Sequence, residues 1–317
     1  MSEIRIHRSL HHSNIVKFEH FFEDKRNVYI LLEMCQNQTM NELLRRRKRL
    51  TELETQCYLV QIIEGTKYLH SHRVIHRDLK LGNLFLSDKM ELKLADFGLA
   101  TKLEFEGDRK KTVCGTPNYI APEVLNGSQG HSYEVDVWSI GVILYTLLIG
   151  KPPYETSDVK TTYKRIKANA YTFPGHIKIS DNARNLITQI LNLDPAKRPT
   201  LNQILEHPFL SKHSVPKLMP TSTLACPPSA SYIKQYTFLP YISVDEKVKL
   251  ESTVPVRSLP LSKIDKNAEV KSTREDTWVV NWVDYSNKYG LGYLMSNGCY
   301  GVYFNDSTKL VLYSNER

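Results

Sequence analysis

The sequence lacks several features that mark other classes of protein. Its five cysteines, at positions 35, 57, 114, 226 and 299, include no C-x-x-C pair, which excludes a disulfide framework and a zinc site of that kind. We therefore expect a reduced, intracellular protein. The longest apolar run, Val137 to Ile149, is interrupted by Ser139 and Gly141 and is too short to cross a bilayer. Charged residues occur throughout the first thirty positions, so we also expect no secretory signal and no membrane partner.

Acidic residues are fewer than basic ones, and the net charge is +8. Basic runs lie at Arg45 to Arg49 and at Arg109 to Lys111. Such a balance suits nucleic acid, acidic peptides or phosphorylated partners. No nucleic-acid motif accompanies it, so we expect no nucleic-acid partner. We interpret the first run as the solvated end of a short helix with Met40, Leu43 and Leu44 on its apolar side.

Three motifs stand in a fixed order along the chain and carry the chemistry. They are Ile75-His76-Arg77-Asp78-Leu79-Lys80-Leu81-Gly82-Asn83, Asp96-Phe97-Gly98 and Ala121-Pro122-Glu123, which match the catalytic loop, the metal-binding turn and the end of the activation segment of a protein kinase. Phosphoryl transfer needs one carboxylate to orient the attacking hydroxyl and other oxygen ligands for Mg²⁺ on the ATP phosphates. We expect Asp78 in the first role, and Asn83 and Asp96 in the second.

Two further residues indicate the substrate class. Lys80 lies two positions after Asp78, where it can neutralise charge on the transferring group, and a lysine here favours serine or threonine over tyrosine as substrate. Thr116, within Gly115-Thr116-Pro117, is expected to hydrogen-bond the same loop. The alternative for Thr116 is that it only caps a turn.

A switch is predicted between the second and third motifs. A phosphate on Thr112 would add a charge of about −1.5 to −2 that guanidinium groups such as that of Arg77 can pair with. The alternative is that Thr112 is an unmodified loop residue. Two structural contacts are also expected: an ion pair of Glu123 with Arg198, and backbone N–H groups of the catalytic loop on Asp136.

The nucleotide base is expected at the end of the second strand, in Leu32-Glu33-Met34-Cys35. Backbone groups of Glu33 and Cys35 would meet adenine, and Phe85 would pack beneath the ring. The alternative for each of these residues is ordinary strand or core packing.

The chain is long enough for one large domain and an appendage. We predict an ordered region over 1–210, a linker over 211–276 and a small antiparallel sheet over 277–317, where aromatic residues alternate between turns. Within the first region we expect strands at Phe18 to Phe22, Val28 to Glu33 and Glu91 to Ala95, and helices at Glu3 to Leu10, Glu52 to His70, from Asp136 onward, Asp158 to Ala168, Asp181 to Leu191 and Leu201 to His207.

With these residues in hand, the whole chain resembles the polo-like kinase family. The likeness is close from Gly115 to Glu123 and from His131 to Ser139, and the run Trp282 to Tyr293 looks like the opening of a polo box. The resemblance implies a two-lobed α+β serine/threonine kinase of mitotic control, found in the nucleus, at spindle poles or centrosomes and in the cytoplasm. In that family two polo boxes bind phosphorylated docking proteins. Trp282 matches a tryptophan that packs on the peptide, and its alternative is a core position in the sheet.

The chain departs from that family at both ends. Glu3 matches the ion-pairing glutamate of a helix near the nucleotide, but no G-x-G-x-x-G motif and no strand lysine precede the hinge. At the other end, the rest of the first polo box and all of the second are missing. We therefore expect a fragment whose upper lobe lacks its first strands, with weak ATP binding and little or no turnover. The alternative function is a non-catalytic, kinase-derived scaffold or phosphopeptide-binding fragment.

Overall fold

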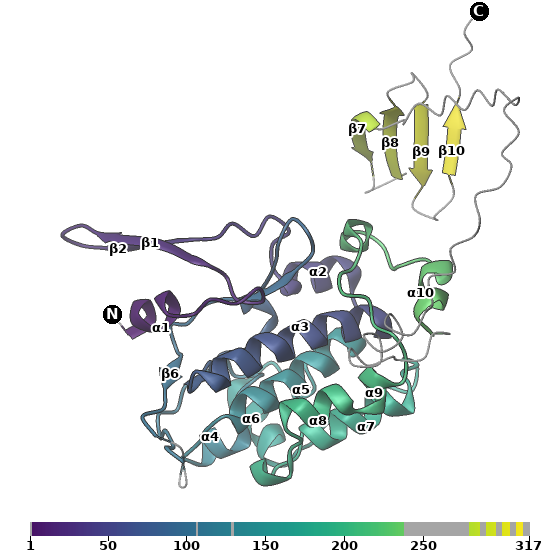
Figure 1. Cartoon of the computed structure of the whole chain (residues 1–317). Coiled ribbons are helices and arrows are strands. Elements are labelled where there is room, and N and C mark those ends of the chain that lie inside the picture. Colours follow the sequence, from purple (N-terminus) through teal and green to yellow (C-terminus); the bar gives the residue numbers. More distant parts are fainter. Residues whose placement is uncertain are drawn as a thin grey trace, which may run out of the picture. The chain divides into compact units, whose positions relative to one another are not determined.

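The computed structural model describes residues 2–105, 107–127, 130–237, 279–285, 290–295, 300–304 and 309–312. The chain divides into two compact units, Met1–Thr253 and Val254–Arg317. Figure 1 shows a helical body in the first unit and a sheet in the second. Each unit is described by itself.

The first unit begins with one helix and a two-stranded hairpin. Helix α1 (Ser2–Arg8) precedes β1 (Phe18–Glu23) and β2 (Val28–Leu32), which pair antiparallel (Figure 1). Several large apolar side chains of the hairpin remain exposed, among them Phe22 at 50% and Leu31 at 45%. The two predicted strands are thus present, but the described residues cover little of their apolar surface.

The body of the unit is helical and surrounds one buried helix. It contains α2 (Met40–Arg47), α3 (Glu52–Ser71), α4 (Pro122–Asn126), α5 (Glu134–Ile149), α6 (Val159–Lys167), α7 (Asp181–Ile190), α8 (Leu201–Glu206) and α9 (Pro208–Ser211). Helix α3 starts at a capping box in which Thr51 and Glu54 satisfy each other's backbone N–H groups. Helix α5 is apolar and buried along nearly its whole length. The expected helices are present, and their ends differ by one or two residues.

Gly141 allows α5 and α7 to approach closely. A Cβ atom at this position would lie 2.5 Å from Ile190 Cγ2 and 2.9 Å from Leu191 Cδ2. The two helices could not keep this separation with a larger residue. The glycine that interrupts the apolar run is therefore a packing feature of the core.

Short strands hold the loops that bear the first two motifs, whereas the third motif starts α4. They are β3 (Val74–Ile75), β4 (Leu84–Leu86), β5 (Leu92–Leu94) and β6 (Thr101–Lys102), with the 3₁₀ helix η1 (Leu81–Asn83) between β3 and β4. Strand β3 pairs with β6, and β4 pairs with β5. The catalytic loop therefore leaves β3, and the metal-binding turn leaves β5.

The first part of the segment predicted as a linker is ordered and packs on the helical body. It contains the 3₁₀ helix η3 (Thr221–Leu224) and helix α10 (Ala230–Thr237). A further 3₁₀ helix, η2 (Pro195–Lys197), lies earlier in the chain, between α7 and α8. We call residues 212–237 the strap. Within it Met219 and Thr223 are buried, and the Lys217 carbonyl accepts a hydrogen bond from Gln61 of α3 at 3.4 Å. The remainder of the predicted linker, 238–276, lies outside the described residues.

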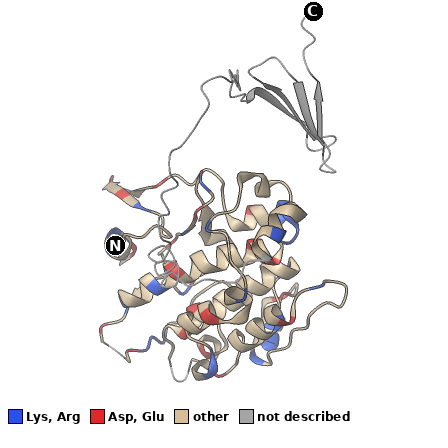
Figure 2. Cartoon of the chain, turned by 45° about the vertical axis from the view of Figure 1, so that its right-hand side comes forward, with Lys and Arg blue, Asp and Glu red and all other residues tan. Residues whose placement is uncertain are grey.

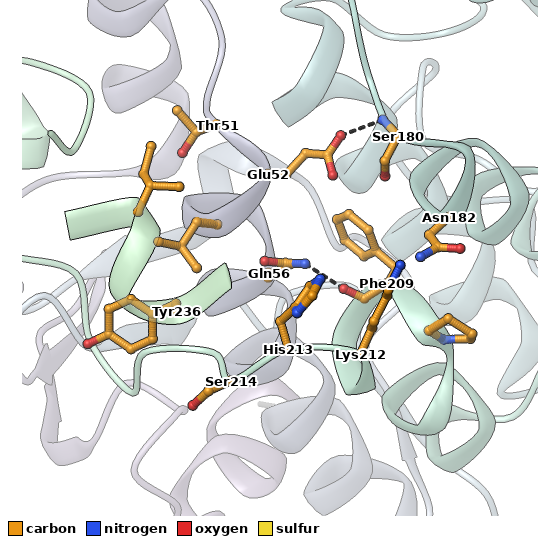
Figure 3. Close-up of a pocket in the computed structure, with 13 residues that line it drawn as sticks. Thr51, Glu52, Gln56, Ser180, Asn182, Phe209, Lys212, His213, Ser214 and Tyr236 are labelled. Atoms are coloured by element: carbon orange, nitrogen blue, oxygen red, sulfur yellow. Dashed lines mark hydrogen bonds between the residues drawn. The ribbon is translucent and has the colours of Figure 1, made fainter. Parts of the chain in front are cut away.

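A pocket of about 370 Å³ lies where the strap meets the starts of α3 and α7 (Figure 3). Its walls are joined by two hydrogen bonds, from Gln56 Nε2 to the Phe209 carbonyl at 2.5 Å and from Ser180 N to Glu52 Oε1 at 2.6 Å. The side chain of Tyr236, from α10, forms part of its lining. Other lining residues from the strap are Lys212, His213, Ser214 and Ile233, so the strap forms one wall of this pocket.

One interpretation of the basic run at the end of α2 is wrong in part. Arg45 is exposed as expected, but the side chain of Arg47 is only 2% exposed. It pairs with the buried Glu54 carboxylate at 2.7 Å and donates to the Thr223 carbonyl of the strap. The sequence does not show that Arg47 is buried, because its partners lie on other elements: Glu54 on α3 and Thr223 on η3.

The second unit contains a four-stranded antiparallel sheet. Strands β7 (Val279–Tyr285), β8 (Gly290–Met295), β9 (Tyr300–Phe304) and β10 (Lys309–Leu312) follow each other in spatial order (Figure 1). The small antiparallel sheet predicted from the alternating aromatic residues is confirmed. Among the described helices of the chain, none is long and apolar enough to span a bilayer.

Candidate active site

Asp78 lies at the centre of a polar network in the catalytic loop. Its side chain is 7% exposed. Lys80 Nζ donates to its Oδ2 at 2.7 Å, and Thr116 Oγ1 donates to its Oδ1 at 2.7 Å. Lys80 also donates to Thr116 Oγ1 at 3.0 Å, so the predicted contact of Thr116 with this loop is present. Lys80 and Thr116 thus fix the carboxylate in one orientation.

Asn83 completes the network from η1. Its Nδ2 donates to the Asp78 carbonyl at 2.9 Å and to Asp78 Oδ2 at 3.2 Å. Because both donated bonds come from the amide nitrogen, the amide oxygen is left for another partner. The Asn83 carbonyl accepts from Ala95 N at 2.9 Å, which ties this loop to the residue before Asp96.

A buried carboxylate supports the loop from below. Asp136 of α5 accepts from His76 N at 3.0 Å, from Arg77 N at 2.9 Å and from His70 Nε2 at 2.9 Å. The predicted role of Asp136 is thus observed as contacts. Burial raises its pKa, but the His70 hydrogen bond and charge, with the other donors, hold the pKa below its usual value. Arg77 has a positive φ of 65°, so these bonds fix the unusual turn that leads into Asp78.

Asp96 begins the metal-binding turn with its side chain exposed. It has a φ of 64°, and its Oδ1 accepts from Gly98 N at 3.2 Å. Phe97 is buried and packs between two histidines, with ring centroids 4.6 Å from His7 and 5.2 Å from His76 and the rings tilted against each other. The buried ring anchors the turn, and the Asp96 carboxylate points away from the core.

Asp96 and Asn83 fit a hard cation. The turn offers a carboxylate and the loop offers an amide oxygen, which are the ligand types that Mg²⁺ prefers. Protein and substrate phosphate oxygens would fill the other positions.

Glu3 of α1 faces the same turn. A Cβ atom on Gly98 would lie 3.2 Å from Asp96 Oδ1 and 3.7 Å from Glu3 Oε2, so the two carboxylates border one small space. Burial raises the pKa of Glu3, and the charge of Asp96 raises it further. No lysine, arginine or histidine in the described part of the chain forms an ion pair with Glu3.

The predicted hinge follows β2. Leu32 is exposed, Glu33 and Cys35 are half-buried, and Phe85 lies nearby on β4 with part of its ring exposed. The Glu33 N–H donates to the Lys17 carbonyl at 2.9 Å, so its carbonyl is the backbone group left for a base. Burial raises the pKa of Cys35 to about 11, which keeps its thiol neutral at neutral pH.

Thr112 is exposed, between the basic residues at 109–111 and the Gly115 turn. No hydrogen bond joins Thr112 to Arg77 in the described residues, and Arg77 Nε donates instead to the Leu99 carbonyl at 2.7 Å.

The predicted ion pair of Glu123 with Arg198 is confirmed at 2.7 Å, with both side chains largely buried. In Figure 2, blue and red segments alternate over the elements of the first unit, so the excess of basic residues does not lie on one element.

Three functional contacts were not predicted. His7 packs against Phe97, His70 holds Asp136, and Lys93 of β5 pairs with Glu33 at 2.8 Å. The sequence carried a signal only for Lys93, a charged residue between two apolar residues of a buried strand. The histidines gave none, because their partners are distant in sequence.

Trp282 lies on β7, where its backbone pairs with Tyr293 of β8. Its side chain is outside what the structure describes, so its contact with a peptide stays a prediction.

Comparison with known proteins identifies the family. The family described as "Protein kinase domain" matches residues 1–210, and the "POLO box duplicated region" matches residues 287–317. The chain belongs to the polo-like kinase family. It is 42% identical over 99% of its length to the serine/threonine-protein kinase polo of Drosophila melanogaster. Protein kinases as a group use ATP and a divalent metal ion.

Two further relatives of this polo-like chain are equally informative. The chain is 46% identical over 98% of its length to the probable serine/threonine-protein kinase CCRP1 of Zea mays, and 46% identical over 99% of its length to the serine/threonine-protein kinase PLK1 of Xenopus laevis. It covers 68% of the maize protein, 58% of the frog protein and 62% of the fly protein. Much of each relative thus lies beyond the match.

Proposed function

We propose that the first unit is a serine/threonine protein kinase that transfers the γ-phosphoryl group of ATP to protein hydroxyls. The observation that carries this proposal is the network in which Lys80, Asn83 and Thr116 all bond the Asp78 carboxylate. Asp78 orients the substrate hydroxyl and accepts its proton. Lys80 can neutralise charge on the transferring phosphoryl group, because its Nζ is held beside the Asp78 carboxylate.

The metal ligands are Asn83 and Asp96, and the ion is Mg²⁺. Bound Mg²⁺ neutralises charge on the nucleotide phosphates. Glu33 and Cys35 hold adenine through their backbone, with Phe85 beneath the ring and Leu32 beside it. Thr112 is the regulatory site, and a phosphate there pairs with Arg77 and orders the segment that bears Thr116.

By family likeness we propose a role in mitotic control, in the nucleus, at spindle poles or centrosomes and in the cytoplasm. Phosphorylated proteins dock through the polo box, with Trp282 on the peptide. The candidate substrates are proteins that such docking brings near.

A second candidate is a non-catalytic scaffold, which one specific observation favours. The Glu3 and Asp96 carboxylates border one space without an ion pair to Glu3 in the described residues, and the hairpin exposes apolar side chains. The scaffold predicts no turnover from this chain, whereas the kinase proposal predicts slow turnover.

Titration of the chain with ATP, with and without Mg²⁺, tests the proposal together with peptide phosphorylation. We expect binding and turnover to require Mg²⁺ and to be lost in Asp96→Ala. Serine and threonine peptides should be phosphorylated, and a matched tyrosine peptide should not. Turnover that persists in Asp96→Ala would refute the metal assignment.

A further inference from the structure

Lys93 is a buried cation in an otherwise apolar strand. It lies between Leu92 and Leu94 on β5, its side chain is 8% exposed, and Asp96 follows three residues later. Its Nζ pairs with Glu33 Oε1 at 2.8 Å and donates to the Ser13 carbonyl at 3.1 Å. One ammonium group thus joins the hinge, the α1–β1 connection and the strand that leads into the metal-binding turn.

Glu33 is held from both sides. Its other oxygen, Oε2, accepts from Lys17 N at 3.0 Å, and its own N–H donates to the Lys17 carbonyl at 2.9 Å. Burial raises the pKa of Glu33, but hydrogen bonds from Lys93 and Lys17 and the Lys93 charge outweigh burial and hold the pKa below its usual value. The carboxylate is therefore ionised at neutral pH and bound to Lys93.

The connection between α1 and β1 is also fixed to β5. Leu94 N donates to the Asn14 carbonyl at 2.8 Å, and Val16 N donates to the Leu94 carbonyl at 2.9 Å. Asn14 Nδ2 donates to the Leu92 carbonyl at 2.9 Å. Hydrogen bonds of the backbone thus attach the α1–β1 connection to β5. The Lys93–Glu33 ion pair attaches the hinge to β5 through side chains.

We propose that Lys93 is a positioning residue for the nucleotide site and acts through Glu33. It fixes the hinge backbone relative to β5, and therefore relative to Asp96. This inference rests on the proposed kinase function, because it assigns adenine to the hinge and the metal to Asp96.

Stability alone does not account for a lysine here. A buried ion pair is often no more stabilising than well-packed apolar residues of similar volume. A methionine would fill the same volume between Leu92 and Leu94. What a methionine cannot do is bond Glu33, so the lysine sets an orientation that an apolar side chain would leave free.

The test compares Lys93→Met, Glu33→Gln and the double variant with the parent chain. We expect amide hydrogen exchange to become faster by at least about five-fold, a change of about 1 kcal/mol, in segments 13–18, 31–36 and 94–98, and to stay unchanged in α5. The dissociation constant for Mg-ATP should rise by a similar factor, with a smaller change in kcat. The double variant should match Lys93→Met rather than the sum of the two single effects, because Lys93→Met already removes the pair with Glu33 together with the Ser13 and Glu91 contacts of Lys93. Lys93→Arg should restore most of the parent behaviour.

Lys17→Met is the matched control. It removes the exposed ion pair of Lys17 with Glu19, whose side chains are 59% and 45% exposed, and keeps the backbone bonds to Glu33. It should leave exchange and ATP binding unchanged.

Unchanged exchange in the three segments of Lys93→Met, strictly additive effects in the double variant, or an equal rise of exchange in α5 would overturn the proposal. Failure of the proposed function has a different signature. If the parent chain showed no Mg²⁺-dependent phosphorylation of the peptides, the kinase assignment would fail, while the exchange measurements would still decide the role of Lys93.

Discussion

At the scale of single residues, the site is a set of short polar contacts around Asp78. The sequence predicted the members of this set, because the three motifs fix both residue type and spacing. It could not predict how the protons are placed. His76 shows this: its Nδ1 accepts from Asp78 N at 3.3 Å, and its Nε2 lies 3.1 Å from the Ala95 carbonyl. Burial lowers the pKa of His76, so the ring is neutral and its Nε2 carries the proton that Ala95 accepts.

Thr116 should contribute through its hydroxyl alone. Thr116→Val keeps the side-chain shape but removes the 2.7 Å hydrogen bond to Asp78. We expect kcat to fall about ten-fold or more, since a hydrogen bond to a charged group contributes about 1.5–3 kcal/mol, with little change in the KM for ATP. Thr116→Ser keeps the hydroxyl and should retain most of the activity. Steady-state kinetics of the two variants measure the effect. If Thr116→Val and Thr116→Ser behaved alike, Thr116 would only cap the turn.

Thr112 is the residue for a regulatory test. Phosphorylated chain should turn over faster than unphosphorylated chain, because the phosphate supplies about −1.5 to −2 charges next to the basic residues at 109–111. The Thr112→Ala variant should show no increase in turnover after treatment with a kinase that phosphorylates Thr112. Peptide phosphorylation before and after that treatment measures the effect. Equal rates for the phosphorylated chain, the unphosphorylated chain and Thr112→Ala would contradict a regulatory role of Thr112.

At the scale of elements, α4, α9, β3, β4 and β6 were not predicted, whereas the helices and strands that were predicted lie within one or two residues of the observed ones. Periodicity and caps determine them, as at Thr51 and Glu54 of α3. The strap was not predicted, because its buried residues are few and spaced without a period. Met219 and Thr223 are buried only because α2 and α3 lie beside them.

Two arginines of α2 provide a matched test of the strap. Arg47→Met leaves the Glu54 carboxylate buried without its cation and frees the Thr223 carbonyl. We expect a loss of about 3–5 kcal/mol in the free energy of unfolding. Arg45→Met breaks an exposed pair with Glu42, so a loss below about 0.5 kcal/mol is expected. Urea unfolding of both variants measures the difference, and equal losses would show that the strap contact is not stabilising.

At the scale of the whole molecule, the chain combines a well-packed helical body with a sparsely covered hairpin. The motifs alone identified the family, and the comparisons agree. The exposure of Phe22 and Leu31 and the meeting of Glu3 with Asp96 required the structure, since each depends on which elements face one another.

Stability of the chain should depend on pH through buried histidines. Burial lowers the pKa values of His7, His76 and His131, so the folded state binds fewer protons than the unfolded state below a pH of about 6.5. Stability is therefore fully present above that value and is lost as the pH falls through it. Denaturant midpoints at pH 7.5 and 5.5 test the sign. An equal or higher midpoint at pH 5.5 would contradict it.

The most direct test of the proposed kinase chemistry is phosphoryl transfer by the 317-residue chain and by its Asp78→Asn variant. Transfer from γ-labelled ATP to a serine/threonine peptide would be measured after both proteins are shown to fold and to bind Mg-ATP alike. We predict slow transfer by the parent chain and a loss of about 10²–10⁴-fold in Asp78→Asn, because Asp78 is the group that orients and deprotonates the hydroxyl. Equal rates in the two proteins, or no transfer by the parent chain above background, would contradict the assignment and favour the scaffold.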